Sequence, residues 1–547
     1  MPGLLDRVAA MAGVQVHGTH ANGGADEHED NDEEEDVCVN ADSDTDAGSE
    51  LETYSGLRPR AWSRSAAPSP VGASPVMRVL ASTYRLLGCY RLTGPTGVVD
   101  DEPVWFLNDE FGSAMRHAAE QPSMRCSPFV YQASGAPGGV AFSLAWPIRF
   151  IDHDEEATRD MFHLEALSPA LRLSLCTCFF RMGREAACRD AWTAWQSRQA
   201  GAMTATPPLE APSPPPVQQS TQTPLRVYTD IDWVQEDVTR PEFTVTPHAE
   251  EAQVVWTKAP LDAASLARLG APPGAMVNQF PGEECLVFKH RLAETARKAA
   301  SARGPKGWLP LTFDATVDLD ALLGAHEEAV QDGRQPLWIM KPWNSGRSLD
   351  ITVAATPQAV AAAVRAGPKI AQQYIARPAL YKGRKYDVRV LVAVTSFAPQ
   401  LVASMWHEMF VRVANRPYDS SPAALGDFQT TFTSMRQRGF EEEGVSEEQL
   451  AQEVGAAGGD WAATRQAIQH MLRDLLSAAA PELGPCPAAR ALYGVDVMFL
   501  EGSLAPQLLE VTFCPGVERP MAADPNFLDK LFGHLFLGEA QGFEPLT

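Results

Sequence analysis

The stretch ALYGVDVMFLEGSLAPQLLEVTFCPG, residues 491–516, decides the fold. Two runs of alternating apolar residues flank a loop centred on Gly502, which predicts an antiparallel β-hairpin. Strand alternation places Asp496 and Glu510 on one face, opposite one another. The other face carries the apolar members of these strands, Val495, Val497, Leu509 and Val511. We expect both carboxylates to be buried, where they repel one another unless a cation neutralises them. Mg²⁺ meets this need, because it accepts one or two carboxylates and completes its shell with water and nucleotide phosphates.

Basic residues upstream strengthen this interpretation. Lys341 ends the strand LWIMKP, Lys385 and Arg389 flank Asp387 in RKYDVR, and Arg412 follows in EMFVRV. Alternation puts Lys385, Asp387 and Arg389 on one strand face, which is unfavourable for a purely structural strand. Phosphates and carboxylates both need charge-assisted donors. The alternative for each residue is an internal ladder of salt bridges, but the set as a whole favours a nucleotide site.

Charge and cysteine usage exclude several classes of protein. The chain has a net charge of −24, of which −14 comes from residues 26–52, leaving −10 elsewhere. This local acidity argues against a direct nucleic-acid-binding surface. No run of eighteen apolar residues occurs, so membrane insertion is not supported. Nine scattered cysteines predict reduced thiols in a cytosolic or nuclear protein, and Cys176 and Cys178 favour buried structural thiols over half of a metal site.

Composition also divides the chain. The acidic tract cannot bury enough apolar surface to fold, so we expect a disordered insert at 21–75, rather than a specific dock for a basic partner. A Pro/Ser/Thr-rich linker at 201–224 marks the main boundary. Residues 76–200 predict a small, mainly β unit that opens with a helical period at 76–94. Residues 225–547 predict one α+β or α/β module of catalytic type.

The chain resembles the tubulin tyrosine ligase-like family of ATP-grasp enzymes. The segments that carry the resemblance are WIMKPWNSGRS, AQQYIARPALYKGRKYDVRVLVAVTSF, HEMFVRVANRPY and GVDVMFLEGSLAPQLLEVTFCPG. VWFLNDEFGS, LRVYTDI and VNQFPGEE resemble a branch that couples a SET-like N-terminal region to the ligase-like domain. The resemblance implies an ATP-grasp-type ligase-like domain at 225–547 and a SET-like, mainly β domain at 76–200. It also identifies residues 1–20 as a fragment of the SET-like region, which predicts that the usual upstream part is absent.

The resemblance implies roles for individual residues. ATP would be held by Lys289, Lys341, Gln372, Tyr374, Ile375, Lys385 and Asp387, with the lysines at the phosphates and 372–375 beside adenine. Asp496, Glu510 and Thr512 would form the Mg²⁺ site. Arg389 and Arg412 would face the acidic tubulin tail or a substrate carboxylate. In an active member, the terminal carboxylate takes a phosphoryl group from ATP, and the amine of an incoming amino acid then displaces phosphate.

Three departures from the family pattern predict a weakened site. Thr512 stands where active members have asparagine, whose amide oxygen reaches the metal better than a hydroxyl. Residues 431–434 read Thr-Phe-Thr-Ser in place of histidine-leucine-threonine-asparagine. Residues 347–350 read Arg-Ser-Leu-Asp in place of an arginine-glycine-x-glycine loop. Without those glycines the loop approaches phosphate less closely, and we expect the charge of Asp350 to repel it.

These observations support three hypotheses. The first is a cytoplasmic protein, also nuclear, that binds tubulin with or without ATP and regulates modification of tubulin C-termini, with weak or no ligase activity. Thr512, Ser434 and the altered loop favour this first hypothesis. The second is an active ligase that adds tyrosine or glutamate to tubulin tails, and it is favoured by the retained Lys341, Lys385, Arg389, Asp496 and Glu510. The third is a SET-type methyltransferase with a histone or chromatin partner. The NDEFGS motif at 108–113 departs from a SET cofactor motif, so an interaction or structural role is favoured for that domain.

Overall fold

The computed structural model describes residues 87–90, 104–107, 115–118, 121–131, 140–161, 168–180, 184–201, 224–259, 261–302, 307–343, 350–421, 424–433 and 443–546. The chain divides into two units. The first comprises Met1–Leu92, Val104–Arg172 and Phe179–Arg181, and the second consists mainly of Met182–Thr547. The predictions for 1–20, for the acidic insert at 21–75, for NDEFGS and for residues 202–223 of the linker lie outside the described residues.

The first unit contains two small sheets. Strand β1 (Leu87–Tyr90) pairs antiparallel with β2 (Val104–Leu107). The second sheet has the order β3-β6-β4-β5, from β3 (Arg116–His117), β4 (Met124–Tyr131), β5 (Val140–Pro147) and β6 (Thr158–Arg159). The mainly β character is confirmed. The helical period expected at 76–94 is wrong for β1, because pairing with a distant strand overrides local periodicity.

The second unit contains a parallel four-stranded sheet of order β10-β9-β7-β8. Its strands are β7 (Leu225–Thr229), β8 (Phe243–Val245), β9 (Val254–Trp256) and β10 (Met276–Val277). A second, antiparallel sheet follows, with the order β11-β14-β12-β13. It consists of β11 (Thr312–Asp314), β12 (Trp338–Pro342), β13 (Thr352–Ala354) and β14 (Lys369–Gln373).

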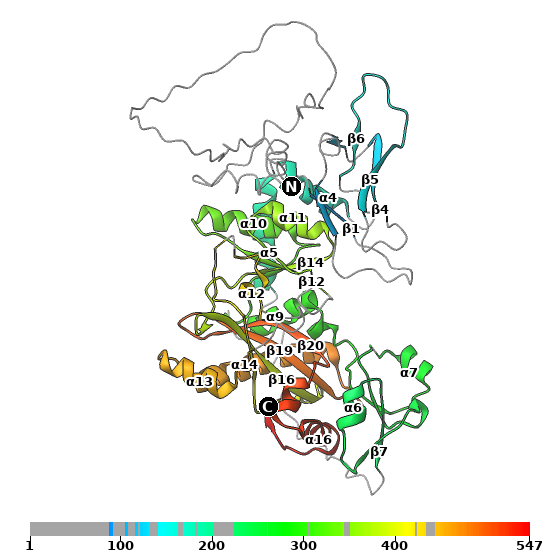
Figure 1. The fold of residues 1–547 in the computed structure, drawn as a ribbon, viewed down its shortest axis with the longest axis vertical. Helices are drawn as coiled ribbons and strands as arrows, with labels where there is room; N and C mark the ends of the chain where they lie inside the picture. Colours follow the sequence, from blue (N-terminus) through cyan, green and yellow to red (C-terminus); the bar gives the residue numbers. More distant parts are fainter. Residues whose placement is uncertain are drawn as a thin grey trace, which may run out of the picture. The chain divides into compact units, whose positions relative to one another are not determined.

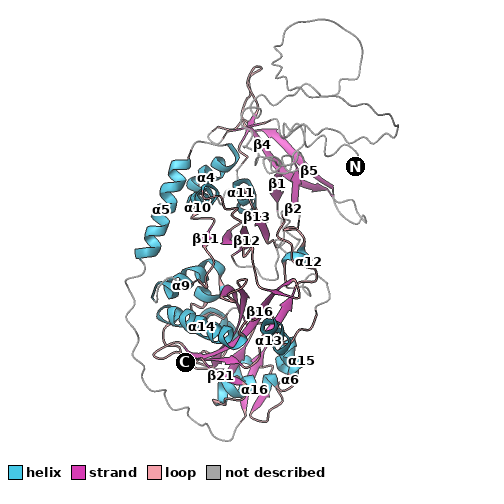
Figure 2. Cartoon of the chain, turned by 90° about the vertical axis from the view of Figure 1, so that its left-hand side faces the viewer, coloured by secondary structure: helices cyan, strands magenta, loops and turns pink. Residues whose placement is uncertain are grey.

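Three helices accompany the antiparallel sheet. Helix α11 (Pro357–Arg365) begins where the sequence predicts, since the Thr356 side chain accepts a hydrogen bond from the amide of Ala359 and Pro357 occupies the first turn. Helix α5 (Glu185–Gly201) packs against α10 (Leu319–Gln331), as Figure 2 shows. Both belong to the second unit, although the sequence assigned α5 to the SET-like domain. Helix α4 (Pro169–Phe180) contributes residues to both units.

The largest sheet has the order β20-β19-β16-β17-β21, and β15 and β18 also pair with β16. Its strands are β15 (Leu380–Tyr381), β16 (Arg384–Ser396), β17 (Val402–Trp406), β18 (Phe410–Val413), β19 (Ala491–Phe499), β20 (Pro506–Phe513) and β21 (Phe543–Pro545). On one face, Val390 and Val392 pack with α9 (Lys289–Ala302) and α14 (Trp461–Leu483). On the other, Leu391 and Ala393 pack with α16 (Phe527–Phe532) and the parallel sheet. Figure 1 shows the helices on both sides of β16.

The remaining short elements connect these layers. They are α6 (Asp232–Asp237), η2 (Ala249–Glu251), α7 (Ala263–Leu269), α8 (Glu284–Val287), α12 (Phe428–Thr431), α13 (Glu447–Ala456), α15 (Glu518–Ala523) and η4 (Gly533–Leu537). Among the described residues, no helix is both long and apolar enough to span a membrane.

The predicted C-terminal hairpin is formed by β19 and β20, and Asp496 lies directly opposite Glu510. Val495, Val497 and Val511 face the core as expected. Leu509 does not, because the register shifts after Asp496 and pairs Val497 with Leu508. Leu508 therefore points into the core at this place in β20, and it is 1% exposed. A bulge of this kind inserts one residue and redirects the side chains beyond it.

Candidate functional site

The site lies on one face of β16. Strand alternation places Lys385, Asp387 and Arg389 on the same face as Leu391 and Ala393. The apolar second half of that face is covered by the core. The charged first half lines cavities instead. The sequence prediction that the three charged residues share a face is confirmed.

Two arginines form forked hydrogen bonds to two buried carboxylates on neighbouring strands. Arg389 donates from Nε to Asp496 Oδ1 at 2.8 Å and from Nη2 to Oδ2 at 2.9 Å. Arg412 donates in the same forked way to Asp387, at 2.6 and 2.9 Å. Its Nη2 also lies 2.8 Å from Asp496 Oδ2, so Arg412 bridges both acids. The Thr433 hydroxyl lies 2.6 Å from Asp387 Oδ2 and completes its shell.

These contacts keep Asp496 ionised. The side chains of Asp387 and Asp496 are 4% and 3% exposed. Burial alone would raise the pKa of the Asp496 carboxyl, but Arg389 and Arg412 hold that pKa well below its usual range. Burial likewise acts to lower the pKa of Arg412, and Asp387 and Asp496 raise it well above its usual value. Asp496 and Arg412 therefore stay charged at neutral pH.

Three lysines surround the network. Lys289 Nζ lies 3.2 Å from Glu510 Oε2. Lys341 donates to the side-chain oxygen of Gln372 at 2.9 Å and to the carbonyl of Leu509 at 3.4 Å. Lys385 donates to the Tyr374 hydroxyl at 3.0 Å, with its ammonium 4.2 Å from the centre of the Tyr374 ring. Lys289 thus neutralises Glu510, whereas the other two contact neutral groups.

Lys341 and Lys385 are buried cations that form no ion pair within the described part of the chain. Burial lowers the pKa of Lys385 to about 7, with Asp387 opposing the shift. Burial lowers the pKa of Lys341 to about 8, with Glu510 opposing it. A buried ammonium without a carboxylate partner is unfavourable unless an anion joins it. This arrangement suits a phosphate-bearing ligand.

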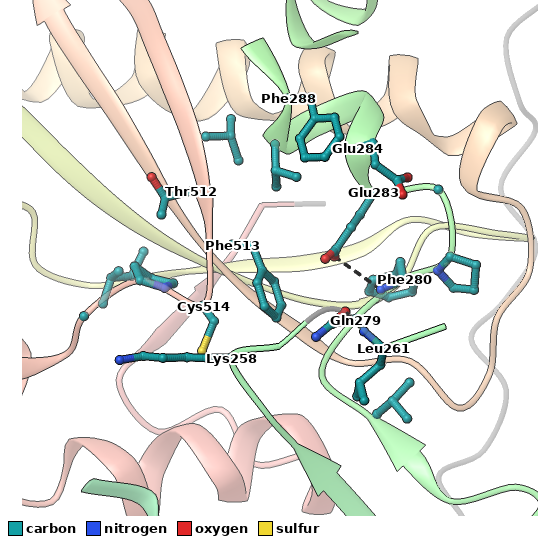
Figure 3. A pocket seen from close by; sticks show the side chains of 18 of the residues that line it. Lys258, Leu261, Gln279, Phe280, Glu283, Glu284, Phe288, Thr512, Phe513 and Cys514 are labelled. Atoms are coloured by element: carbon teal, nitrogen blue, oxygen red, sulfur yellow. Dashed lines mark hydrogen bonds between the residues drawn. The ribbon is translucent and has the colours of Figure 1, made fainter. Parts of the chain in front are cut away.

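Two cavities meet at this cluster. The smaller, about 100 Å³, is lined by Lys341, Tyr374, Ile375 and Lys385 together with both acids of the hairpin. The larger, about 1510 Å³, lies beside the end of β20. Figure 3 shows Glu283 and Glu284 on one wall of the larger cavity and Thr512, Phe513 and Cys514 on the β20 side. Arg412 and Glu510 line both cavities.

The larger cavity has charges of both signs. Its basic lining residues are Lys258, Lys289, Arg389, Arg412 and Arg519, and its acidic ones are Asp262, Glu283, Glu284, Glu510 and Glu518. Burial raises the pKa of Glu283 to about 7, and this carboxyl accepts a hydrogen bond from the Tyr493 hydroxyl at 2.8 Å. Three of the basic residues, Arg389 on β16, Arg412 on β18 and Lys289 at the start of α9, are paired with carboxylates where the cavity meets the arginine network.

The structure brings the predicted residues together but corrects several expectations. Glu510 is not fully buried, with 27% of its side chain exposed. Arg389 and Arg412 bind internal carboxylates, although both also line the larger cavity. Asp350 does not present a free charge to phosphate, because it forms a buried ion pair with Lys369. Arg347–Leu349 and Ser434 of the two altered motifs lie outside the described residues.

Sequence reasoning missed two contributors. Thr433 was considered only as part of a degraded motif, yet its hydroxyl bonds Asp387. Lys369 pairs with Asp350 and donates to the Asp350 carbonyl at 2.9 Å. A lysine at the first position of a predicted strand resembles a solvent-facing residue, so only its 1% exposure reveals the role.

The metal expected at the hairpin can be tested against these contacts. Asp496 Oδ1 accepts one guanidinium hydrogen bond and Oδ2 is shared by two guanidinium groups. Glu510 is paired with Lys289, and Thr512 offers only a neutral hydroxyl. No group of three or more His, Cys, Asp or Glu side chains within the described ranges is arranged to hold a metal. The donor set therefore fits Mg²⁺ poorly, whereas the lysines fit phosphate.

Comparison with known proteins identifies the family to which this architecture belongs. The sequence pattern of the tubulin-tyrosine ligase family matches residues 267–544, about half of the chain. The chain belongs to this family. The pattern of the tubulin tyrosine ligase SET-like domain matches residues 67–177. An ATP-grasp-like fold preceded by a SET-like domain, as the sequence predicted, is therefore confirmed.

Relatives agree with this assignment to the family. Tubulin–tyrosine ligase-like protein 12 of Homo sapiens is 29% identical over 504 residues, covering 85% of this chain and 74% of its own length. The protein of the same name from Caenorhabditis elegans is 26% identical over 484 residues, covering 81% and 69%. A probable tubulin polyglutamylase, TTLL2 of Mus musculus, is 26% identical over 274 residues, covering 46% and 49%. The last match spans only part of each chain.

Proposed function

We propose that this protein regulates the modification of tubulin C-termini by binding tubulin and a nucleotide, with weak or no ligase activity of its own. The observation that carries the proposal is the engagement of Asp496, whose two oxygens are both held by guanidinium groups. Ligation by phosphoryl transfer depends on neutralising and positioning phosphate charge, usually with a metal. This chain keeps the cations that attract phosphate, but Asp496, the acid that would hold the metal, is already bound by arginines.

Support for a tubulin partner comes from the names of the relatives and from the position of the basic residues. An acidic tail would lie in the larger cavity beside Lys258, whose side chain is exposed there. The relatives named above point to tubulin modification and give no support to the histone or chromatin partner, so that partner is not carried forward. We also propose a cytoplasmic location, which a tubulin partner would require, with a nuclear pool as well.

A second function is an active ligase that adds tyrosine or glutamate to tubulin tails. The observation in its favour is the retained cluster of Lys341, Lys385 and Glu510 around one cavity. In such an enzyme ATP would supply the phosphoryl group, and Lys341 and Lys385 would hold its phosphates. Two arginines already bind Asp496, the acid that would hold the metal, so an active ligase is the less favoured function.

Ligation and binding can be measured separately on the full chain. With tubulin, ATP, Mg²⁺ and radiolabelled tyrosine or glutamate, we expect no incorporation above the level without protein, while the chain still binds an acidic tubulin tail peptide. Lys258 is exposed at the larger cavity, so Lys258→Glu should weaken peptide binding about tenfold. Lys382→Glu, an exposed lysine away from the cavities, is the control. Incorporation that disappears in Glu510→Gln would establish the active ligase instead.

Nucleotide binding should depend on pH. The pKa of Lys385 in the folded chain is lowered to about 7, so its ammonium is present below pH 7 and lost as pH rises. Since only the charged form attracts phosphate, we expect the affinity for ATP to fall about tenfold between pH 6 and pH 8, measured by calorimetry. The arginine of Lys385→Arg stays charged over this pH range, so the variant should lose the part of the pH dependence that Lys385 causes. The pH dependence that remains in the variant is then due to titration of ATP itself. Equal slopes in the two proteins would contradict the role of Lys385.

A further inference from the structure

Each carboxylate at the junction of the two cavities already has a cation of the protein beside it. Asp496 is bound by Arg389 and Arg412, Asp387 shares Arg412, and Glu510 is paired with Lys289. In a metal-dependent site, the divalent ion separates such carboxylates from the phosphates and neutralises both. Here the guanidinium groups already neutralise the acids.

We propose that this site binds nucleoside triphosphates without a divalent cation, with Arg389 and Arg412 neutralising Asp496 in place of the metal. The inference rests on the proposed function, because it concerns the nucleotide site named there. It goes further in stating which form of the nucleotide the site takes.

The geometry of the arginine grip disfavours metal entry. A forked guanidinium–carboxylate pair uses both oxygens and holds the plane of the carboxylate. A third donor from Arg412 shares Oδ2, and the side chain is only 3% exposed. A metal could reach Asp496 only if at least one arginine withdrew, which would leave a buried guanidinium without its partner. Glu510 and Thr512 remain as ligands, and Glu510 would also have to release Lys289.

The charge balance favours an anion without further help. Five cations and three carboxylates line the junction, namely Lys289, Lys341, Lys385, Arg389, Arg412, Asp387, Asp496 and Glu510. This set holds two more basic side chains than carboxylates. Lys341 and Lys385 carry this excess, because their hydrogen bonds are to neutral groups. A polyphosphate therefore meets uncompensated ammonium groups, with no need for a metal to bridge it to the acids.

The deciding measurement is calorimetric titration of ATP into the full chain, in excess EDTA and in Mg²⁺. We expect dissociation constants that agree within about threefold. Affinity that falls more than about tenfold in EDTA would overturn the inference and leave the proposed function standing. Failure to bind in both conditions would overturn the inference together with the nucleotide part of the proposed function, while tubulin binding is tested independently of it.

A variant gives a second, metal-specific readout. Arg389→Gln removes the forked donor from Asp496 but leaves Arg412 in place. We expect this variant to bind Mn²⁺, detected by electron paramagnetic resonance without nucleotide, at concentrations where the wild type binds none. Arg465→Gln is the matched control, since Arg465 forms ion pairs with Glu447 and Glu544 away from the site and its side chain is 19% exposed against 20% for Arg389. Mn²⁺ binding by the wild type would contradict the inference, and this result does not require the variant to fold.

Discussion

Arg412→Leu is expected to lower the free energy of unfolding by about 3–5 kcal/mol. The guanidinium is buried and bonds both Asp387 and Asp496, at distances of 2.6 to 2.9 Å. Leucine fills part of the volume but leaves Asp387 with only the Thr433 hydroxyl, in a place where a carboxylate has almost no access to water. Removing one partner of a buried pair costs more than the pair contributes, because the remaining charge stays desolvated. Urea denaturation followed by tryptophan fluorescence measures the loss.

The control is Arg334→Leu, in an exposed ion pair with Asp332 where both side chains are 58% exposed. Such a pair contributes about 0–1 kcal/mol, so little change is expected. The pH dependence gives a further check. The folded pKa of Asp496 is depressed, so its contribution to stability is present above the unfolded value near 4 and is lost as pH falls through the folded pKa. A cost below about 1 kcal/mol for Arg412→Leu would mean that water reaches the acids and that the network is not fixed.

The sequence predicted the hairpin and its facing acids because both depend on local rules. Alternation along β19 and β20 sets the face of each residue, and a short loop sets which residues oppose one another, so Asp496 and Glu510 could be paired without a structure. The bulge broke this rule from Leu509 back towards the loop, so that Leu508 takes the place expected for Leu509 in the core. Nothing in the local pattern marks where a strand inserts one extra residue, so Leu508 could not be identified as the core residue.

Partner choice within the site could not be predicted in the same way. The sequence correctly grouped Lys385, Asp387 and Arg389 on one face. However, Asp387 bonds Arg412 on the paired strand β18, and Arg389 bonds Asp496, about a hundred residues away. Which cation meets which acid depends on the registers β16–β18 and β16–β19, which join strands far apart in the chain. Sequence therefore indicated the charges of the site, while long-range register decided that the arginines bind internal acids.

Helix α5 shows the same limit at the level of domains. Cys188, Trp192 and Trp195 recur at helical spacing and form its apolar stripe. Trp195 packs 4.7 Å from Phe313 between ring centres, and Trp192 donates to Glu328 at 2.7 Å. An amphipathic stripe predicts that a helix is buried but not against what, so the sequence assigned α5 to the preceding domain. The structure packs it on α10, where Gly324 allows the close approach.

Gly324→Ala is therefore expected to destabilise the protein by about 1–3 kcal/mol, although alanine is the better helix former. A Cβ atom at Gly324 would lie 2.2 Å from the backbone oxygen of Cys188 and 2.8 Å from the Cβ of Trp192. Backbone atoms of a packed helix cannot rotate away, so α5 must move and its contacts with Phe313 must loosen. Thermal and urea unfolding measure the stability, and quenching of Trp192 and Trp195 fluorescence reports their exposure.

Gly455→Ala provides the matched control. Gly455 is exposed within α13, and a Cβ atom there meets nothing within 4 Å. Helix propensity alone should then stabilise the chain by about 0.5–1 kcal/mol. The same chemical change is thus expected to have opposite signs at the two glycines, because only Gly324 separates two helices at backbone distance. If both substitutions stabilise, α5 is not held against α10 in solution, and the helix would belong to the linker instead of the ligase-like unit.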